Sequence, residues 1–411
     1  MDSKTMRPKI IDSNIISSNP DQRHVLTLGK RTLDILILKF DSFDRPSFSE
    51  EVLAYSKNSL IAYWDFEKFS FEHKPDYIRG LPRILKYPKP GRSKWFRMIS
   101  LPFLLAYHTL LLIFCFGYIC VRYRPEVCWT ENTFVAMFFG FLKKLGFCKH
   151  TIYFIGDWLV SERKQGLQKY FANNIIWGSM DYFAASLSDL VINISDEISR
   201  ARETRWGRNI TKRECSHFPP TIKINPNVDN RPRNNICFLG QVREDSGLNL
   251  LIPLLRPLNE KLGIKLKLIG TGTPHRKILE KQIRTQEVED CVKLYDWAEI
   301  KNLPDLLGDC FCGLNLLTSL ESYSVYTVPG KLIQYLQMLV PVLITKNNGA
   351  FTEVTLQHDL GMVIEPNAEA IIPAIETLMK DQDNYRRKII NFTENQQAKT
   401  VKDYIELSKR N

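Results

Sequence analysis

Three residues near position 330 have the types and spacing expected of a phosphate and ribose site. Gly330 and Lys331 follow Pro329, which suits the first turn of a helix because its φ is fixed and no amide partner is lost. Free amides and the positive end of a helix attract anions, and Lys331 adds a full charge there. Gln334 follows Gly330 by four residues, so it shares a helical face and could hydrogen-bond a ribose hydroxyl. An ordinary amphipathic helix before a buried strand also explains this stretch.

Other polar groups and glycines stand where predicted strands end. Gly270 and Gly272 follow an apolar strand at 264–269, and two glycines at such a point let a ligand approach the backbone. Asp157 follows a strand predicted at 150–155. Ligands bind at the carboxyl ends of parallel strands, so Asp157 is a candidate polar group of the site. Its alternative role is to cap a loop.

The elements that would position these residues alternate between strands and helices. This alternation predicts an α/β fold of two Rossmann-like domains, with parallel sheets that face a cleft. We expect strands at 9–12, 32–40, 126–129, 150–155, 189–194, 236–239 (ending in Gly240), 264–269, 292–295, 312–316, 341–345 and 361–364. Helices are expected at 18–29, 132–146, 174–187, from 195 onward, at 247–262 and at 383–408. Ser18 or Asn19 is expected to cap the helix at 18–29, and Ser195 the helix that begins there. Residues 41–74 fit neither pattern.

Length and composition agree with two domains. A chain of 411 residues is too long for one core, and a segment rich in Pro and Asn at 218–233 reads as a linker. The predicted units are an N-terminal acceptor-binding domain (1–220), a C-terminal nucleotide-sugar-binding domain (234–382) and a C-terminal helix (383–411) that packs back across the domains. Nine cysteines without a CxxC pair, and an N-terminus without an apolar signal core, favour a cytoplasmic location.

The net charge of +11 is concentrated in the first half of the chain. Residues 1–230 contain 33 Lys and Arg against 23 Asp and Glu, whereas residues 231–411 contain 23 against 22. An anionic membrane surface fits this excess better than nucleic acid, because no nucleic-acid motif accompanies it. A solvated basic loop is the alternative. The basic residues gather before an apolar run and are Arg79, Arg83, Lys86, Lys89, Arg92, Lys94 and Arg97.

The apolar run covers residues 101–120 and is long enough to span a bilayer. A strand of the same sheet is expected to begin near Glu126, however, and a spanning helix could not return the chain to that sheet in so few residues. We therefore expect a buried or interfacial helix, and a chain docked peripherally at the inner face of a membrane. A true span is the alternative.

Several runs together resemble the GT-B glycosyltransferases, and most closely the retaining family-four-like group. The runs are FLGQVREDSG, LKLIGTG, VKLYDWAEIKNLPDLLGDCFCGLNLL and VPGKLIQYLQMLVPVLITKNNGAFTEV, which cover the donor domain over about 235–365. The first half matches more loosely, through RPEVCWTEN, IYFIGDW and SLSDLVINIS.

The resemblance implies a sugar transfer from a UDP- or GDP-linked donor to a lipid-linked or oligosaccharide acceptor, with retention and without a metal. It places the diphosphate near Arg243 and Lys331, with Gly240, Gly270, Gly272 and Gly330 beside the nucleotide. Asp296 and Trp297 would lie near the base. Arg243 and Lys331 would stabilise the leaving diphosphate.

This sequence departs from the family's pattern at two glutamates. Tyr326 and Gln334 occupy their positions, and Ser246 replaces a common lysine. Gln334 can still hold a ribose, and Glu321 is a candidate to supply the missing carboxylate. A catalytically silent GT-B partner subunit and a sugar-nucleotide epimerase are therefore rival interpretations; the epimerase lacks clear counterparts for its carboxylates.

Overall fold

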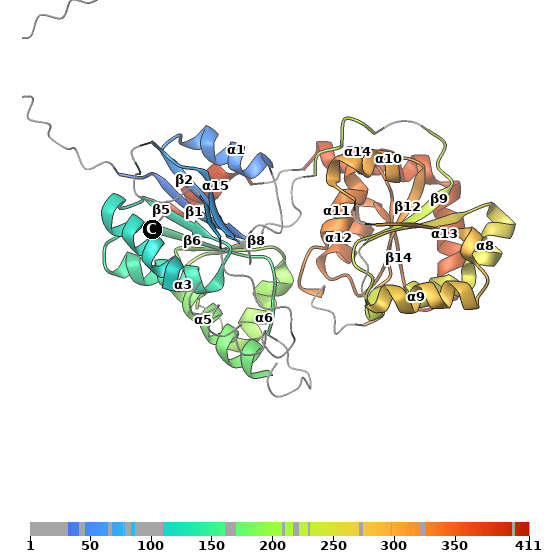
Figure 1. Ribbon diagram of the computed structural model, residues 1–411, viewed down its shortest axis with the longest axis horizontal. Coiled ribbons are helices and arrows are strands. Elements are labelled where there is room, and N and C mark those ends of the chain that lie inside the picture. Colours follow the sequence, from blue (N-terminus) through green and yellow to red (C-terminus); the bar gives the residue numbers. More distant parts are fainter. Residues whose placement is uncertain are drawn as a thin grey trace, which may run out of the picture. The chain divides into compact units, whose positions relative to one another are not determined.

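The computed structural model of the chain contains two β-sheets, each covered by helices on both faces (Figure 1). The described residues are 32–40, 46–64, 68–76, 78, 84–86, 110–160, 170–207, 210–216, 222–228, 231–270, 274–296, 298–319, 325–396 and 399–410. The predicted α/β fold with two largely parallel sheets is confirmed. The strand expected at 9–12 and the helix expected at 18–29 lie outside the described residues.

The first sheet has the strand order β4-β3-β2-β1-β5-β6-β7-β8. Its strands are β1 (Ile35–Phe40), β2 (Ser59–Trp64), β3 (Lys68–His73), β4 (Ile84–Lys86), β5 (Val127–Thr130), β6 (His150–Ile155), β7 (Leu190–Asn193) and β8 (Glu214–Ser216). Pairing is parallel from β2 through β1 to β8. It is antiparallel between β2, β3 and β4, an edge for which the sequence pattern of residues 41–74 gave no prediction. Three residues separate β2 from β3, and a parallel crossover needs a dozen or more.

Alternating side chains of β1 enter two different cores, as the period of a strand requires. Leu36 and Leu38 pack with α3 (Thr133–Lys144) and with the helical residues 110–123. Ile35 and Ile37 pack on the opposite face with α1 (Pro46–Tyr55) and α15 (Val401–Lys409). Two further helices, α5 (Gly178–Leu187) and α6 (Asp196–Trp206), cover the strands toward β8.

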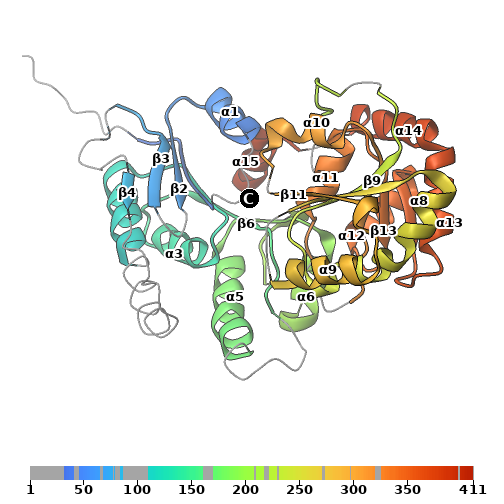
Figure 2. The ribbon, with the colours of Figure 1, turned by 45° about the vertical axis from the view of Figure 1, so that its right-hand side comes forward.

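The C-terminal segment is two helices, so the prediction of one long helix is wrong. Helix α14 (Gln382–Glu394) ends at Asn395, and α15 begins after a capping box between Thr400 and Asp403. Helix α15 lies beside α1, where the Val401 amide donates to Glu51 Oε2 at 3.1 Å (Figure 2). The end of the chain therefore completes the core of the first sheet.

The second sheet is parallel throughout its pairs and has the order β11-β10-β9-β12-β13-β14. Its strands are β9 (Asn235–Leu239), β10 (Lys265–Ile269), β11 (Val292–Tyr295), β12 (Cys310–Asn315), β13 (Val342–Thr345) and β14 (Gly361–Ile364). Numbered along the chain, this is the order 3-2-1-4-5-6 of a doubly wound sheet. The order reverses between β9 and β12, and such folds bind ligands at the carboxyl ends of the strands beside that point.

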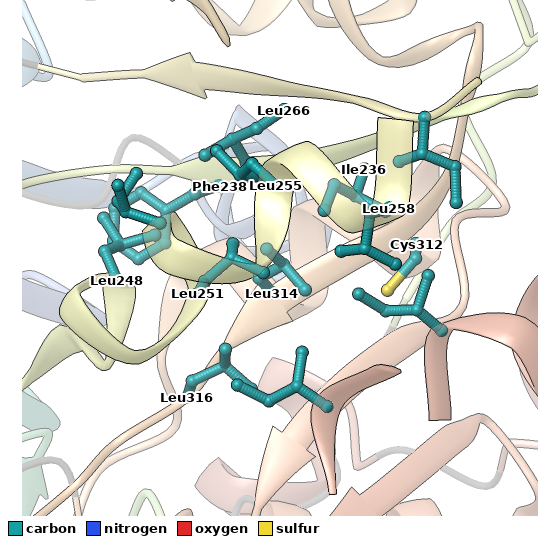
Figure 3. Close-up of a cluster of buried hydrophobic side chains, with 14 of the residues drawn as sticks. Ile236, Phe238, Leu248, Leu251, Leu255, Leu258, Leu266, Cys312, Leu314 and Leu316 are labelled. Atoms are coloured by element: carbon teal, nitrogen blue, oxygen red, sulfur yellow. The ribbon is translucent and has the colours of Figure 1, made fainter. Parts of the chain in front are cut away.

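Helices cover both faces of the second sheet. One face packs on α8 (Leu255–Leu262), α9 (Pro274–Thr285) and α13 (Ile371–Lys380), through the apolar cluster drawn in Figure 3. The other face packs on α10 (Leu303–Leu307), α11 (Gly330–Gln337), α12 (Ala350–His358) and α14. The cluster includes Ile236, Phe238, Leu255, Leu266 and Leu314, which fix the strands that carry the site.

Two predicted helices have irregular turns. The helix expected at 247–262 is divided into α7 (Leu248–Leu251), a 3₁₀ turn (Ile252–Leu254) and α8. Pro253 has no amide hydrogen to continue the α-helical ladder, which explains the break. The helix expected at 174–187 is preceded by a π-helical turn at Phe171–Trp177.

Candidate active site

The candidate site lies where β9 and β10 end, next to the reversal of strand order. Gly240 follows β9 with a φ of +109°, a conformation that favours glycine. A Cβ on Gly270, after β10, would lie 1.9 Å from the Gly240 carbonyl oxygen. Only glycine therefore fits at Gly270. The two backbones meet without side chains between them. The approach of a ligand to these glycines stays a prediction.

Helix α11 brings Lys331 to the same edge of the sheet. Leu332 and Leu336 are fully buried on its inner face, which confirms the amphipathic helix predicted here. Tyr335 fixes the helix to β9, because its hydroxyl accepts a hydrogen bond of 2.7 Å from the Leu239 amide. The helix starts at Gly330 without a side-chain cap, although the Leu332 amide donates to the Pro329 carbonyl at 2.9 Å. The amides of Gly330 and Lys331 precede it at the end of the helix that attracts anions.

Lys331 has no hydrogen bond or ion pair with any described residue. Its Nζ lies 4.1 Å from the centroid of the Phe238 ring, a cation–π contact that leaves the ammonium protons without acceptors. Burial, and then the charge of Arg243, lowers the pKa of Lys331 to about 7, while Asp245 opposes this shift. Lys331 as a whole residue is only partly buried.

Arg243 contributes the second positive charge. Its Nη2 lies 2.9 Å from Asp245 Oδ2, and both side chains are partly exposed. The charge of Arg243 also contributes to the lowered pKa of Lys331. That Arg243 and Lys331 hold one diphosphate stays a prediction. Asp245 is a member of this group that the sequence interpretation did not single out.

Backbone contacts hold the Arg243 loop in place. The Arg243 carbonyl accepts hydrogen bonds from the Ser246 amide at 3.2 Å and the Ser246 hydroxyl at 2.7 Å. Gly247 has a φ of +69°, and a Cβ there would lie 2.0 Å from the Leu316 carbonyl oxygen. The Thr318 amide donates to the Asp245 carbonyl at 3.1 Å. The loop is therefore fixed to the end of β12 through its main chain.

A buried amide network supports the end of β12 from the side of β13. Asn348 donates to the carbonyls of Asn315 at 3.0 Å and Thr345 at 2.8 Å. Thr345 Oγ1 and Asn347 Nδ2 both donate to the Leu317 carbonyl, at 2.8 and 2.9 Å. The strand end that positions the Arg243 loop is thus tied to its neighbour by side-chain amides.

Arg276 is a second residue that the sequence interpretation missed. This nearly buried side chain donates to the Gly270 carbonyl and, at 3.2 Å, to the Tyr295 carbonyl. It also pairs with Glu280 at 2.9 Å and with the exposed Asp296 at 3.5 Å. The spacing of four residues between Arg276 and Glu280 was a readable signal for a helical ion pair. Arg276 locks the ends of β10 and β11 together.

The remaining predicted residues occupy different places. Gln334 lies in α11, one turn after Gly330, and is partly buried. Asp157 follows β6 in the first sheet, so it belongs to a different sheet from Arg243 and Lys331. The Asp157 side chain is exposed, although nearby protein atoms raise the pKa of its carboxyl group. Glu321, Gly272 and Trp297 lie outside the described residues.

Tyr326 has a structural role where the family pattern has a glutamate. Its side chain packs against a buried cluster that includes Trp158 and Ala184. Its carbonyl accepts a hydrogen bond of 2.7 Å from Ser195 Oγ. Ser195 precedes α6 but makes no side-chain cap there, so the prediction that it caps that helix is wrong. The Ser195 hydroxyl donates to the Tyr326 carbonyl instead.

A doubly wound second sheet with Arg243 and Lys331 near its switch point agrees with the resemblance to GT-B glycosyltransferases. Residues 221–396 match the family model described as "Glycosyl transferases group 1". The second half of the chain is therefore similar in sequence to the group 1 glycosyltransferases, and the fold is GT-B. No curated protein matches the chain in sequence.

Solved structures share the fold at low sequence identity. Anabaena Alr3699/HepE, in complex with UDP and glucose, has 13% identity and a TM-score of 0.57, over 91% of this chain and 97% of its own. WaaG, a glycosyltransferase involved in lipopolysaccharide biosynthesis, has 11% identity and a TM-score of 0.58, over 92% and 100%. Sucrose-phosphate synthase from Thermosynechococcus elongatus has 13% identity and a TM-score of 0.58, over 87% of this chain and 94% of its own.

Proposed function

We propose that the chain transfers a sugar, with retention, from a nucleotide-sugar to a lipid-linked or oligosaccharide acceptor in surface polysaccharide or glycoconjugate assembly. The observation that carries this proposal is Lys331 at the start of α11, whose ammonium has no ion pair with any described residue and contacts the Phe238 ring instead. Two of the similar structures are of proteins bound to UDP or involved in lipopolysaccharide biosynthesis, which supports the donor and the pathway class.

In this mechanism the protein stabilises the leaving diphosphate. As the bond between the sugar and the phosphate oxygen breaks, negative charge grows on the diphosphate, and Lys331 and Arg243 oppose it. The free amides of α11 at Gly330 add donors without adding flexible side chains. These groups supply the electrostatic role that a divalent cation has in other enzymes, so we propose a metal-independent reaction.

The other site residues orient the donor. Gln334 holds a ribose hydroxyl from the same helix, while Gly240, Gly270 and Gly272 let the nucleotide approach the strand ends. The family resemblance assigns Trp297 to the base. Glu321 supplies the carboxylate toward the sugar, since Tyr326 packs into a buried cluster and is not placed to do so. Asp157 supplies a polar group for the acceptor.

A ligand screen tests this proposal. UDP- and GDP-sugars are added in turn and the unfolding temperature is measured. A ligand at 100 times its dissociation constant stabilises the folded state by about 2.7 kcal/mol, which is readily seen as a shift. A shift with one class of donor that is lost in Lys331→Met supports the assignment. The absence of a shift with every donor would refute it.

A catalytically silent partner subunit is the second candidate. It is favoured by Tyr326, whose packing replaces a carboxylate with a structural contact. Such a subunit would bind a nucleotide-sugar without hydrolysing it, whereas the transferase hydrolyses it slowly. An epimerase would release an isomeric nucleotide-sugar, which chromatography of the product detects.

We also propose peripheral docking at the cytoplasmic face of an anionic membrane. Within residues 110–123 the exposed side chains include Leu110, Phe114, Tyr118 and Val121, which recur at helical spacing on one face. Phe114 is 71% exposed, which is unusual for an aromatic side chain unless something covers it. In the described part of the chain, no helix has the length and apolarity needed to cross a bilayer.

A further inference from the structure

The cationic site contains one carboxylate of its own, from Asp245. Its Oδ2 accepts a hydrogen bond of 2.9 Å from Arg243 Nη2, and the two side chains are 17% and 32% exposed. The charge of the same carboxylate opposes the lowering of the Lys331 pKa. With two cations and one anion, the three side chains carry one net positive charge where the proposed ligand carries several negative charges.

The carboxylate of Asp245 is not needed to shape its loop. The main-chain bonds from Ser246 to Arg243 and from Thr318 to Asp245 fix the backbone, and Gly247 seats the loop against Leu316. Among the described residues, the carboxylate of Asp245 contacts Arg243 alone. Its main effect is therefore on the charge and orientation of that guanidinium.

We propose that Asp245 is a specificity-determining counter-charge, which competes with the diphosphate for Arg243 and so limits how tightly the site holds its product. This inference rests on the proposed function, because it assumes that a diphosphate is the ligand. A guanidinium has five donors, and the edge bound to Asp245 is not available to phosphate at the same time. The ion pair between Asp245 and Arg243 would then re-form as the product leaves, which assists its release.

An orienting role predicts the opposite sign. If Asp245 only aims Arg243 at the ligand, removal of its charge cannot strengthen binding. Asp245→Asn separates the two roles, because the asparagine Oδ1 still accepts from Arg243 while the negative charge is gone. Glu244→Gln is a matched control, since Glu244 is exposed and changes the charge of the same loop by the same amount.

The test is calorimetric titration of the full chain with inorganic pyrophosphate at low salt. We expect Asp245→Asn to bind about tenfold more tightly than wild type, as one unit charge removed from a partly buried site allows. Glu244→Gln should bind within about twofold of wild type, because exposed charges are screened. Equal or weaker binding by Asp245→Asn, or no pyrophosphate binding by either chain, would overturn the inference.

Titration with UDP and GDP separates this inference from the proposed function. Tighter binding of pyrophosphate by Asp245→Asn, with no binding of either nucleotide, would keep the counter-charge and reject the nucleotide-sugar donor. Nucleotide binding that Asp245→Asn leaves unchanged would keep the donor and reject the counter-charge. Lys331→Met introduced with Asp245→Asn should remove the gain, which places the pyrophosphate at this site.

Discussion

The Nζ of Lys331 lies 4.1 Å from the centroid of the Phe238 ring, and no described residue accepts a hydrogen bond from it. An aromatic face offers an ammonium only a weak attraction. Phe238 is fully buried in the core of the second sheet, so the ring that Lys331 contacts is itself packed in that core. The contact leaves the charge of Lys331 available to an anion.

Lys331→Met should remove activity without loss of stability. Turnover of an accepted donor should fall, because the variant loses roughly 3 kcal/mol of transition-state stabilisation, the scale of one lost electrostatic donor. The unfolding temperature should stay the same or rise, because the variant removes an enclosed charge that has no anionic partner. Initial rates and thermal unfolding measure the two effects. The exposed Lys261→Met serves as control, and equal turnover in both variants would contradict the role of Lys331.

Diphosphate binding should take up protons above neutral pH. Burial and Arg243 lower the pKa of Lys331 to about 7, against the partial opposition of Asp245, so the ammonium is largely neutral at pH 8.5. A bound diphosphate favours the charged form and raises that pKa again. Affinity should therefore decline as the pH rises above about 7.

Calorimetry in two buffers of different ionisation heat, at pH 8.5, measures this proton uptake. Phosphate groups, with a second pKa of about 6, are already ionised there. Uptake of equal size in Lys331→Met would assign the protons to another group. The free chain should also gain stability from pH 7 to 10, since the unfolded Lys331 then holds a proton that the folded one has lost.

Gln334→Leu should weaken the binding of free nucleotide and nucleotide-sugar alike. The side chain lies one helical turn from Gly330, and a leucine of similar size cannot hydrogen-bond a ribose. We expect a loss of about 1 to 2 kcal/mol, the usual contribution of such a hydrogen bond. Isothermal titration with the donor from the ligand screen measures it. Equal affinities would make Gln334 a bystander.

Asn348→Ala should destabilise the fold. Asn348 is fully buried and donates to the carbonyls of Asn315 and Thr345. Both acceptors would lose a partner, at a cost of about 2 to 3 kcal/mol. Urea unfolding measures the change, with the exposed Asn249→Ala as control. An unchanged unfolding midpoint would show that the network does not support the end of β12.

Much of the second sheet was predictable from the sequence because each strand there is a short apolar run with a glycine or polar residue at its end. The helix at Gly330–Gln337 followed from the same local pattern. The antiparallel edge at β3 was not predictable, since aromatic and charged residues hide the period of those strands. Nor was the division of the C-terminal segment into α14 and α15.

The contacts that tune the site could not be predicted. Arg276 donates to the carbonyls of Gly270 and Tyr295 at the ends of two strands, and no local period signals these contacts. Ser195 precedes a helix and has the residue type of a cap, yet its hydroxyl donates to Tyr326, which lies 131 positions later. Tertiary contacts of this kind override local preference.

Membrane docking should depend on both charge and the exposed apolar face. Wild type should sediment with anionic vesicles at low salt and be released by high salt, because basic contacts are screened. Changing Arg83, Lys86, Lys89 and Arg92 to glutamine should weaken sedimentation, at about 1 kcal/mol for each residue near the surface.

Phe114→Ser should weaken sedimentation as well, while Ile278→Ser, at an exposed position in α9, should not. If the wild-type chain never sediments, its basic residues do not bind anionic membranes and the docking proposal is wrong. A chain that salt never releases would show that the attachment is not peripheral.

The central claim is that Lys331 stabilises a diphosphate leaving group, and donor hydrolysis without acceptor tests it most directly. The purified chain is incubated with UDP- and GDP-sugars, and the released nucleoside diphosphate is measured for wild type, Lys331→Arg and Lys331→Met. We predict slow release by wild type with one donor, partial activity in Lys331→Arg, and a loss of about 100-fold in Lys331→Met, which corresponds to roughly 3 kcal/mol. Hydrolysis that is equal in wild type and Lys331→Met would contradict the account.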